Sequence, residues 1–158
     1  IQIINLYNNL SIQTIIKDCC VYFISDHSFY DKKLIEVFDE ANFPCFFFKN
    51  LERKGPGLTR NLGLKYSFNK YVLFWDSDDL FPNNNVLEIL YGSIKHSKQD
   101  FGVFKISNSD ESIEKINLIL KREFLNKNNI KYSKFFFGED SIFLDRCDAY
   151  GESYELKD

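Results

Sequence analysis

The chain has 158 residues, of which 44% are hydrophobic, and its 20 basic and 23 acidic side chains give a net charge of −3. This length suits one domain with a sizeable core. The well-mixed charges exclude the basic stripe that a nucleic-acid partner requires. No apolar run reaches the roughly 18 residues that would span a bilayer, so we expect no transmembrane segment in this chain.

Two further features of composition bear on context. Methionine is absent and the chain opens on a strand-like run, so we expect an excerpt of a larger protein. The cysteines show no zinc-ligand spacing, and two of them are adjacent, which disfavours a bridge between them. We therefore expect reduced thiols and a cytoplasmic protein, with any membrane association made through regions outside this chain. The cysteines are Cys19, Cys20, Cys45 and Cys147.

Short apolar runs alternate with helix-like stretches along the chain. The predicted strands are residues 1–4, 20–25, 43–48, 71–75, 101–106 and 116–120. The predicted helices are residues 9–17, 31–41, a stretch that starts at Pro56, and then 82–97, 122–128 and 141–150. Such alternation is typical of βαβ units, so we expect one α/β domain with a mostly parallel mixed sheet flanked by helices.

The most informative segment is the apolar run 71–75 that leads directly into Asp76-Ser77-Asp78-Asp79. In an extended chain Asp76 and Asp78 would point to the same side. At a separation of about 7 Å and an effective dielectric of about 20, their repulsion is roughly 2 kcal/mol. A hard divalent cation bound between them would remove that cost. The alternative interpretation is a solvated acidic turn that caps the following helix.

Four other segments accompany the acidic one, in a fixed order. Ile3-Ile4-Asn5-Leu6-Tyr7-Asn8 resembles the motif I-I-P-x-Y-N, and Ser25-Asp26-His27-Ser28 with Asp31 resembles D-D-G-S-x-D. Gly57-Leu58-Thr59-Arg60-Asn61-Leu62-Gly63 is similar to G-x-x-A-R-N-x-G, and Gly138-Glu139-Asp140-Ser141 to an E-D motif before a helix. With the D-x-D element, these segments resemble the family 2 glycosyltransferases, which have the GT-A fold.

The resemblance implies both an architecture and an activity. It implies a GT-A-like single domain over residues 1–158, with a nucleotide-binding half at 1–80 and an acceptor-side half at 81–158. It implies an inverting transferase that moves a sugar from a nucleoside-diphosphate sugar, most simply a UDP-sugar, to a hydroxyl of a saccharide or lipid-linked saccharide. Mn²⁺ or Mg²⁺ would assist, and the abundance of Lys, Asn, Ile and Phe suggests bacterial surface polysaccharide synthesis.

The resemblance also assigns roles to residues on the donor side. Asp78 would ligate the metal directly, and Asp76 would contact the metal or the ribose. Asp26 would accept a hydrogen bond from the base, and the permanent cation Arg60 would face the diphosphate. The alternative for Arg60 is a structural ion pair with Asp26 or Asp76. The donor-binding residues implied in this way are Tyr7, Asn8, Asp26, Arg60 and Asp76.

On the acceptor side, the resemblance makes Asp140 the general base that removes the proton of the acceptor hydroxyl. The alternative is that Glu139 and Asp140 only favour the N-terminus of the following helix. In the helix that starts at Pro56, we expect Leu58, Leu62 and Tyr66 to form a buried stripe. Arg60 and Asn61 would then lie off this stripe, on faces free to meet a ligand.

Two other classes of protein remain as alternatives. A phosphohydrolase could use the D-x-D element as nucleophile and acid, although Leu80 stands where it would favour Thr or Val. A sugar-nucleotide-binding module could keep the same residues without turnover. A calcium-binding loop is excluded by its spacing, because Phe81 and Leu87 stand where the glycine and the glutamate should be.

Overall fold

The computed structural model describes residues 2–27, 32–107 and 114–156. Its helices are α1 (Gln2–Ser11), the short 3₁₀-helix η1 (Ile16–Asp18), α2 (Lys32–Asp39), α3 (Pro56–Tyr66), α4 (Val86–His96), α5 (Arg122–Lys127) and α6 (Glu139–Tyr150). Its strands are β1 (Val21–Ser25), β2 (Cys45–Lys49), β3 (Tyr71–Leu73), β4 (Phe101–Ser107), β5 (Glu114–Lys121) and β6 (Ser153–Glu155).

The strands form two hydrogen-bonded sheets. β1 and β2 pair in parallel, with Val21 opposite Cys45. The second sheet has the order β3-β5-β4-β6, in which β5 runs antiparallel to β3 and β4 while β6 runs parallel to β4. The mixed α/β architecture is as predicted, but the expectation of mostly parallel strands is wrong. Only six residues, 108–113, join β4 to β5, and a parallel pair needs a crossover of a dozen or more.

The predicted first strand at residues 1–4 is also wrong, because α1 occupies Gln2–Ser11. Ile3, Leu6 and Leu10 recur at helical spacing, and Leu6 and Leu10 are buried in one hydrophobic cluster with Phe23. A periodic apolar face over ten residues thus outweighs the strand propensity of the isoleucines at its start. The predicted helix 9–17 is divided, since α1 ends at Ser11 and only a single 3₁₀ turn follows.

Most other predicted elements are confirmed to within a few residues. The strand before the acidic segment is shorter than expected, since β3 ends at Leu73. The last strand, β6, was not predicted. In α3 the buried residues are Gly57 and Thr59, so the prediction of a buried stripe made of Leu58, Leu62 and Tyr66 is wrong.

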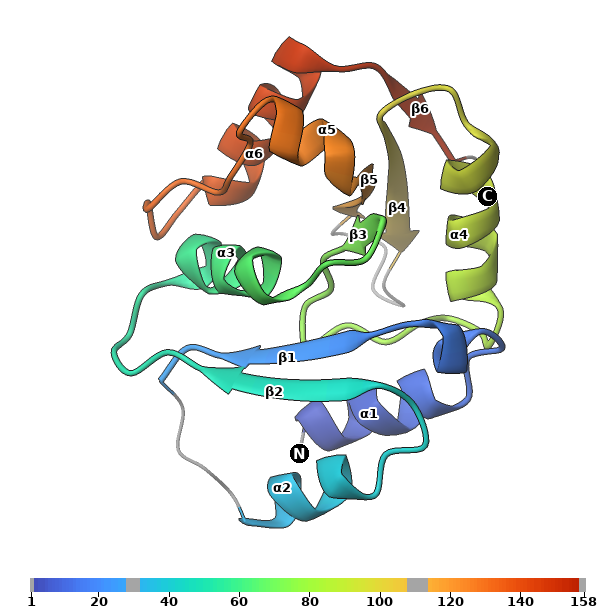
Figure 1. Cartoon of the computed structure of the whole chain (residues 1–158), viewed down its shortest axis with the longest axis vertical. Helices are drawn as coiled ribbons and strands as arrows, with labels where there is room; N and C mark the ends of the chain where they lie inside the picture. The colour runs from blue at the N-terminus through green and yellow to red at the C-terminus, as the bar shows by residue number, and fades with distance from the viewer. Residues whose placement is uncertain (1, 28–31, 108–113, 157–158) are drawn as a thin grey trace.

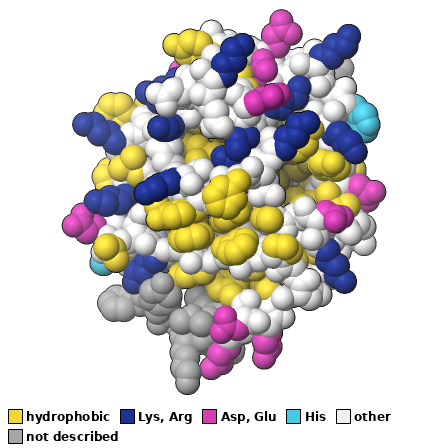
Figure 2. All heavy atoms as spheres, in the orientation of Figure 1, with side chains coloured by type: hydrophobic (Ala, Val, Ile, Leu, Met, Phe, Trp, Pro, Cys, Tyr) yellow, Lys and Arg dark blue, Asp and Glu magenta, His cyan; other side chains and the backbone are white. Residues whose placement is uncertain are grey.

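The elements stack in layers around β1 and β2. In Figure 1, α3 lies on one side of these two strands, and α1 and α2 lie on the other. Figure 2 shows hydrophobic side chains gathered across the middle of this face, over β1 and β2, with Lys and Arg side chains around them. A row of stacked rings contributes to the α3 side of the strands, from Phe46 through Tyr22 and Phe48 to Tyr66.

Three hydrophobic clusters hold the layers together. One joins α5 and α6 to the second sheet, one joins α1 and α2 to β1 and β2, and one packs α4 on β4 and β5. All four cysteines are free thiols, as predicted. Within the described ranges, no helix combines the length and apolar character needed to cross a membrane.

Candidate active site

The acidic segment after β3 forms a tight turn rather than an extended strand end. The backbone N–H of Asp79 donates to the carbonyl oxygen of Asp76 at 3.1 Å. One carboxylate oxygen from each of Asp76, Asp78 and Asp79 lies within 4.8 Å of the others. The acids therefore meet because the chain turns, and not because alternate residues of a strand share a face. The turn also brings in Asp79, which sequence reasoning did not assign as a metal ligand.

Trp75 holds the acidic turn in place through two contacts. Its ring stacks on Phe81 with centroids 3.8 Å apart. Its indole N–H donates to the carbonyl oxygen of Asp79 at 3.0 Å. The Asp79 side chain is buried, whereas Asp78 is exposed. The aromatic contacts thus fix the backbone of the turn and leave part of its acidic surface open.

Arg60 joins the acidic turn to the start of α6. Its Nη2 donates to Oδ1 of Asp76 at 2.8 Å, and its Nη1 donates to Oδ1 of Asp140 at 2.8 Å and to Oε1 of Glu139 at 3.0 Å. The guanidinium also lies 5.2 Å from the centroid of the Tyr132 ring. A single cation from α3 therefore holds three carboxylates from two distant segments. The ion pair with Asp76 is one of the two structural alternatives foreseen for this arginine.

Glu139 and Asp140 differ in exposure although both occupy the first turn of α6. The Glu139 side chain is 8% exposed, and that of Asp140 is 64% exposed. Desolvation by the surrounding protein raises the pKa of Asp140, and the negative charges of Glu139 and Asp76 add to this rise and outweigh Arg60. Glu139, which sequence reasoning treated only as a helix-start residue, is therefore a buried part of the site.

Asp26 lies at the end of β1 and binds the segment that precedes α3. Its Oδ1 accepts from the backbone N–H of Lys54 at 2.7 Å and from Asn50 at 3.0 Å, and its Oδ2 accepts from the backbone N–H of Gly55 at 2.8 Å. Burial alone would raise the pKa of Asp26. The hydrogen bonds from Lys54, Asn50, Gly55 and Thr59 outweigh burial and lower it. Asp26 thus has a structural role that the sequence did not indicate.

The side chain of Asn61, on α3, binds the segment before α6 through two hydrogen bonds. Its side-chain amide donates to the carbonyl oxygen of Tyr132 at 3.0 Å and accepts from the backbone N–H of Tyr132 at 2.9 Å. The two segments approach closely at Gly57, where a Cβ atom would lie 2.5 Å from the carbonyl oxygen of Ser133. The prediction that Asn61 is free to meet a ligand is therefore wrong, because both ends of its amide bind backbone.

Tyr7 and Asn8 lie on α1, not at the exit of a strand. The Tyr7 ring stacks on Phe43 at 5.5 Å and meets the edge of Phe38 at 6.1 Å, and Asn8 is exposed. The resemblance of their segment to a strand-exit motif therefore does not extend to its structure. In the motif around Asp26, Ser28 and Asp31 lie outside the described residues.

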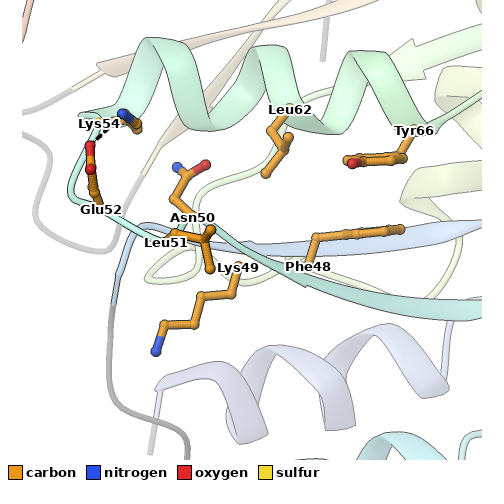
Figure 3. Close-up of a pocket in the computed structure, with 8 residues that line it drawn as sticks. All are labelled: Phe48, Lys49, Asn50, Leu51, Glu52, Lys54, Leu62 and Tyr66. Carbon is orange, nitrogen blue, oxygen red and sulfur yellow. Dashed lines mark hydrogen bonds and ion pairs between the residues drawn. The ribbon is translucent and has the colours of Figure 1, made fainter.

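Two cavities adjoin these groups. The larger, of about 940 Å³, is bordered by Asp26, Arg60 and Asp76 together with β1 and β3. The smaller, of about 360 Å³, lies between α3 and the segment that leaves β2, as Figure 3 shows. Its lining residues, which include Lys54 paired with Glu52, contain none of the acids of the turn. The larger cavity is therefore the one that connects with the acidic site.

Comparison with known proteins decides the family. The family described as glycosyl transferase family 2 matches residues 5–152, which is nearly the whole chain. The chain belongs to this family. Membership in glycosyl transferase family 2 confirms the relationship that the D-x-D and R-N-x-G segments suggested. A comparison with curated proteins finds no significant sequence match.

Solved structures agree with the glycosyl transferase family 2 assignment at the level of fold. The crystal structure of S. aureus TarS 1-349 matches with a TM-score of 0.88 at 20% identity, covering 99% of this chain and 54% of that one. The same protein in complex with UDP-GlcNAc matches at 0.86 and 22% identity, covering 99% of this chain and 52% of that one. The chain thus spans about half the length of these structures, and the GT-A-like fold is confirmed.

A more distant structure in this comparison contains a metal. The mannosyltransferase PcManGT from Pyrobaculum calidifontis, in complex with GDP-Man and Mn²⁺, matches with a TM-score of 0.82 at 14% identity, covering 99% of this chain and 51% of that one. In our family 2 chain the turn supplies an all-carboxylate donor set from Asp76, Asp78 and Asp79. Hard divalent cations prefer such oxygen ligands, so the residues present fit a Mg²⁺ or Mn²⁺ ion.

Proposed function

We propose that this chain is the catalytic domain of an inverting glycosyltransferase that uses a nucleoside-diphosphate sugar, most simply a UDP-sugar. The observation that carries the proposal is the shared guanidinium of Arg60, which binds Asp76 of the acidic turn and Asp140 of α6. This contact supports the proposal because it would keep a donor site at the acidic turn close to a base on α6. Residues 1–80 would form the donor side, and residues 81–158 the acceptor side.

On the donor side, Asp76, Asp78 and Asp79 would hold the divalent cation, with Asp78 as the most exposed of the three. When bound, that cation would neutralise charge on the leaving diphosphate. Asp26 would accept an N–H group of the nucleotide base, in exchange for one of the donors that it binds in this structure. Arg60 would balance the negative charge of the acids and could turn one N–H group toward the diphosphate. Tyr7 and Asn8 remain proposals, and their place on α1 gives them little support.

On the acceptor side, Asp140 would remove the proton of the acceptor hydroxyl. The new bond forms between that oxygen and the anomeric carbon while the bond from this carbon to the diphosphate breaks. Attack from the face opposite the leaving group inverts the anomeric configuration. The raised pKa of Asp140 favours this role, because a base works best when its pKa approaches the working pH. The acceptor would be a saccharide or a lipid-linked saccharide, in the synthesis of a bacterial surface polymer.

Calorimetry with UDP tests the donor side. We expect binding to the wild-type chain in Mn²⁺ to weaken at least tenfold when a chelator is added, and Asp78→Ala to show the weak binding in both conditions. Asp145→Ala, which alters an exposed aspartate of α6, is the matched control and should bind as the wild type does. Equal affinity with and without chelator would contradict the metal-assisted donor site.

A second measurement separates the classes of enzyme. A phosphohydrolase would release inorganic phosphate from a simple phosphomonoester, and a binding module would bind UDP without consuming a sugar donor. We expect no phosphate release above that of Asp76→Asn, and we expect donor turnover once an acceptor is supplied. Phosphate release that disappears in Asp76→Asn would replace the transferase proposal by the hydrolase.

A further inference from the structure

Three consecutive phenylalanines are exposed in the segment that leads into α6. Phe135, Phe136 and Phe137 are 58%, 51% and 91% exposed. Figure 1 shows this segment in orange, between α5 and α6, projecting beyond both helices. Single exposed apolar side chains are ordinary on a protein surface, whereas a contiguous apolar patch marks a site of interaction. We call these three residues the aromatic tip.

The chain on both sides of the aromatic tip is held in place. Before the tip, Asn61 binds the carbonyl oxygen and the backbone N–H of Tyr132 at 3.0 and 2.9 Å. After the tip, the side chain of Glu139 is buried at the start of α6. Within the tip, the ring of Phe136 packs on Gly55, where an added Cβ atom would lie 3.1 Å from the ring. These contacts fix the tip at the surface and keep its other two rings away from the core.

Basic side chains surround the aromatic tip. Lys134 directly precedes it, and Lys131 lies three residues further back. Arg53 lies two residues before Gly55, the residue on which the tip packs. All three basic side chains are exposed. Along the left margin of Figure 2, where the tip and the segment before α3 lie in Figure 1, hydrophobic side chains alternate with Lys and Arg side chains.

Acidic side chains near the tip do not cancel this positive charge. Glu52 is bound to Lys54 at 2.8 Å, and Asp140 is bound to Arg60 at 2.8 Å. In contrast, the three basic residues around the tip form no ion pair within the described part of the chain. A chain with a net charge of −3 thus carries a locally positive surface here.

The combination of phenylalanines with basic residues distinguishes between partners. Protein interfaces are enriched in aromatic residues but depleted in Lys. Segments that lie on a bilayer surface combine Phe, Trp or Leu with Lys and Arg, which anionic headgroups attract. A projecting tip would also need a matching hollow in a folded partner, whereas fluid acyl chains adapt to its shape. The aromatic tip therefore fits an anionic lipid surface better than a protein surface.

We propose that the aromatic tip docks this chain on an anionic lipid bilayer. Its rings would enter the boundary between headgroups and acyl chains, to a depth of roughly 5–10 Å. Arg53, Lys131 and Lys134 would lie among the anionic headgroups. Phe137 stands three residues before Asp140, whose side chain is 64% exposed, so docking would bring this carboxylate close to the membrane surface. That consequence would serve a lipid-linked acceptor and rests on the proposed function, whereas the docking itself does not.

The first test measures binding to vesicles of mixed phosphatidylcholine and phosphatidylglycerol by co-sedimentation. We expect the double variant Phe135→Ser, Phe137→Ser to bind roughly a hundredfold more weakly than the wild type, because two rings no longer enter the bilayer. Phe68→Ser is the matched control, since it removes a ring that is 81% exposed beyond the other end of α3, and it should bind as the wild type does. Equal binding of the double variant and the wild type, or no binding by either, would overturn the proposal.

The second test varies the charge of the vesicle and of the protein. On vesicles of phosphatidylcholine alone, wild-type binding should fall roughly a hundredfold, because three basic side chains lose their attraction. Lys131→Gln with Lys134→Gln should weaken binding to the anionic vesicles by about fivefold for each residue. Lys95→Gln, which alters an exposed lysine of α4, is the control. Binding that does not depend on the charge of the lipid would overturn the anionic surface as the partner.

Two further measurements separate other occupants of the tip. If the tip held the acceptor, the double Phe variant would raise KM for a water-soluble saccharide and leave vesicle binding unchanged. If a second copy covered the tip, the wild type would form a dimer in sedimentation equilibrium that the double variant does not form. We expect the same KM and the same mass for both proteins, and either alternative result would overturn lipid docking. The vesicle measurements need no transferase activity, so a failure of the proposed function would leave them unaffected.

Discussion

Asp26 and Asp140 both belong to the candidate site, but their surroundings shift the pKa of the two carboxyl groups in opposite directions. Asp26 accepts hydrogen bonds from Asn50 and from two backbone N–H groups, and these bonds lower its pKa despite burial. Asp140 is more exposed, but local desolvation and its acidic neighbours raise its pKa. The contrast separates a carboxylate that holds backbone in place from one that can exchange a proton. Residue type alone would not distinguish them.

The largest expected effect on catalysis comes from replacing Asp140, the proposed general base. Asp140→Asn should lower kcat by about 10²–10⁴, since the general base is lost, while UDP affinity stays within a factor of two. Steady-state kinetics and calorimetry measure the two quantities. Asp148→Asn, on the same helix and exposed, is the control. Unchanged turnover in Asp140→Asn would remove the base from the proposed mechanism.

The next effect comes from Arg60, which connects Asp140 with the acidic turn. Arg60→Gln leaves the nearly buried Glu139 without its cation, so the free energy of unfolding should fall by about 3 kcal/mol. Urea unfolding measures this loss.

A double substitution with Glu139→Gln removes the stranded charge, and it should recover part of the stability. If the double variant is as unstable as the sum of the single ones, the pair does not carry the proposed interaction.

Asp26 is the aspartate of this pair that binds backbone. Asp26→Asn should destabilise the protein by roughly 1–2 kcal/mol at pH 7, because charge-assisted hydrogen bonds are lost. The folded-state pKa of Asp26 lies below its unfolded value of about 3.9, so its contribution is complete above that value and declines as pH falls through the folded pKa. The difference between wild type and variant should therefore shrink at pH 3. Asp39→Asn, which alters an exposed residue at the end of α2, is the control. A difference that grows in acid would contradict this account.

The smallest expected effect sharpens the comparison by changing one neighbour of Asp140. Glu139→Gln removes a negative charge that helps to raise the pKa of Asp140. The acidic limb of the pH profile of kcat/KM should therefore move to lower pH, as measured over pH 4–8 by initial rates. A shift toward higher pH would show that the limb belongs to another group.

The sequence predicted the fold best where apolar runs alternate with amphipathic helices. β1, α2 and α4 are such cases. It failed at α1, where the local preference of isoleucine for strands pointed one way and contacts with distant residues such as Phe23 decided the other. The antiparallel placement of β5 was missed although the predicted strands 101–106 and 116–120 leave only nine residues between them, fewer than a parallel crossover needs.

For the candidate site, the sequence indicated most of the acids that lie together but not how they are held together. The turn that unites Asp76 with Asp79 depends on the packing of Trp75 against Phe81, which local propensity does not reveal. Two of the three ion pairs of Arg60 join residues 79 and 80 positions apart. Pairings of that range follow from the assembled fold, so a motif can name the partners without specifying the bonds.

Gly57 carries a consequence for how the site keeps its dimensions. It lies in the first turn of α3, against the carbonyl oxygen of Ser133, where no side chain can fit. Arg60 occupies the next turn of the same helix, so the closeness that Gly57 permits also fixes the reach of the guanidinium. A single added methyl group would push away an entire helix rather than one side chain. The distance between the acidic turn and Asp140 thus depends on how closely two backbone segments approach at a residue without a side chain.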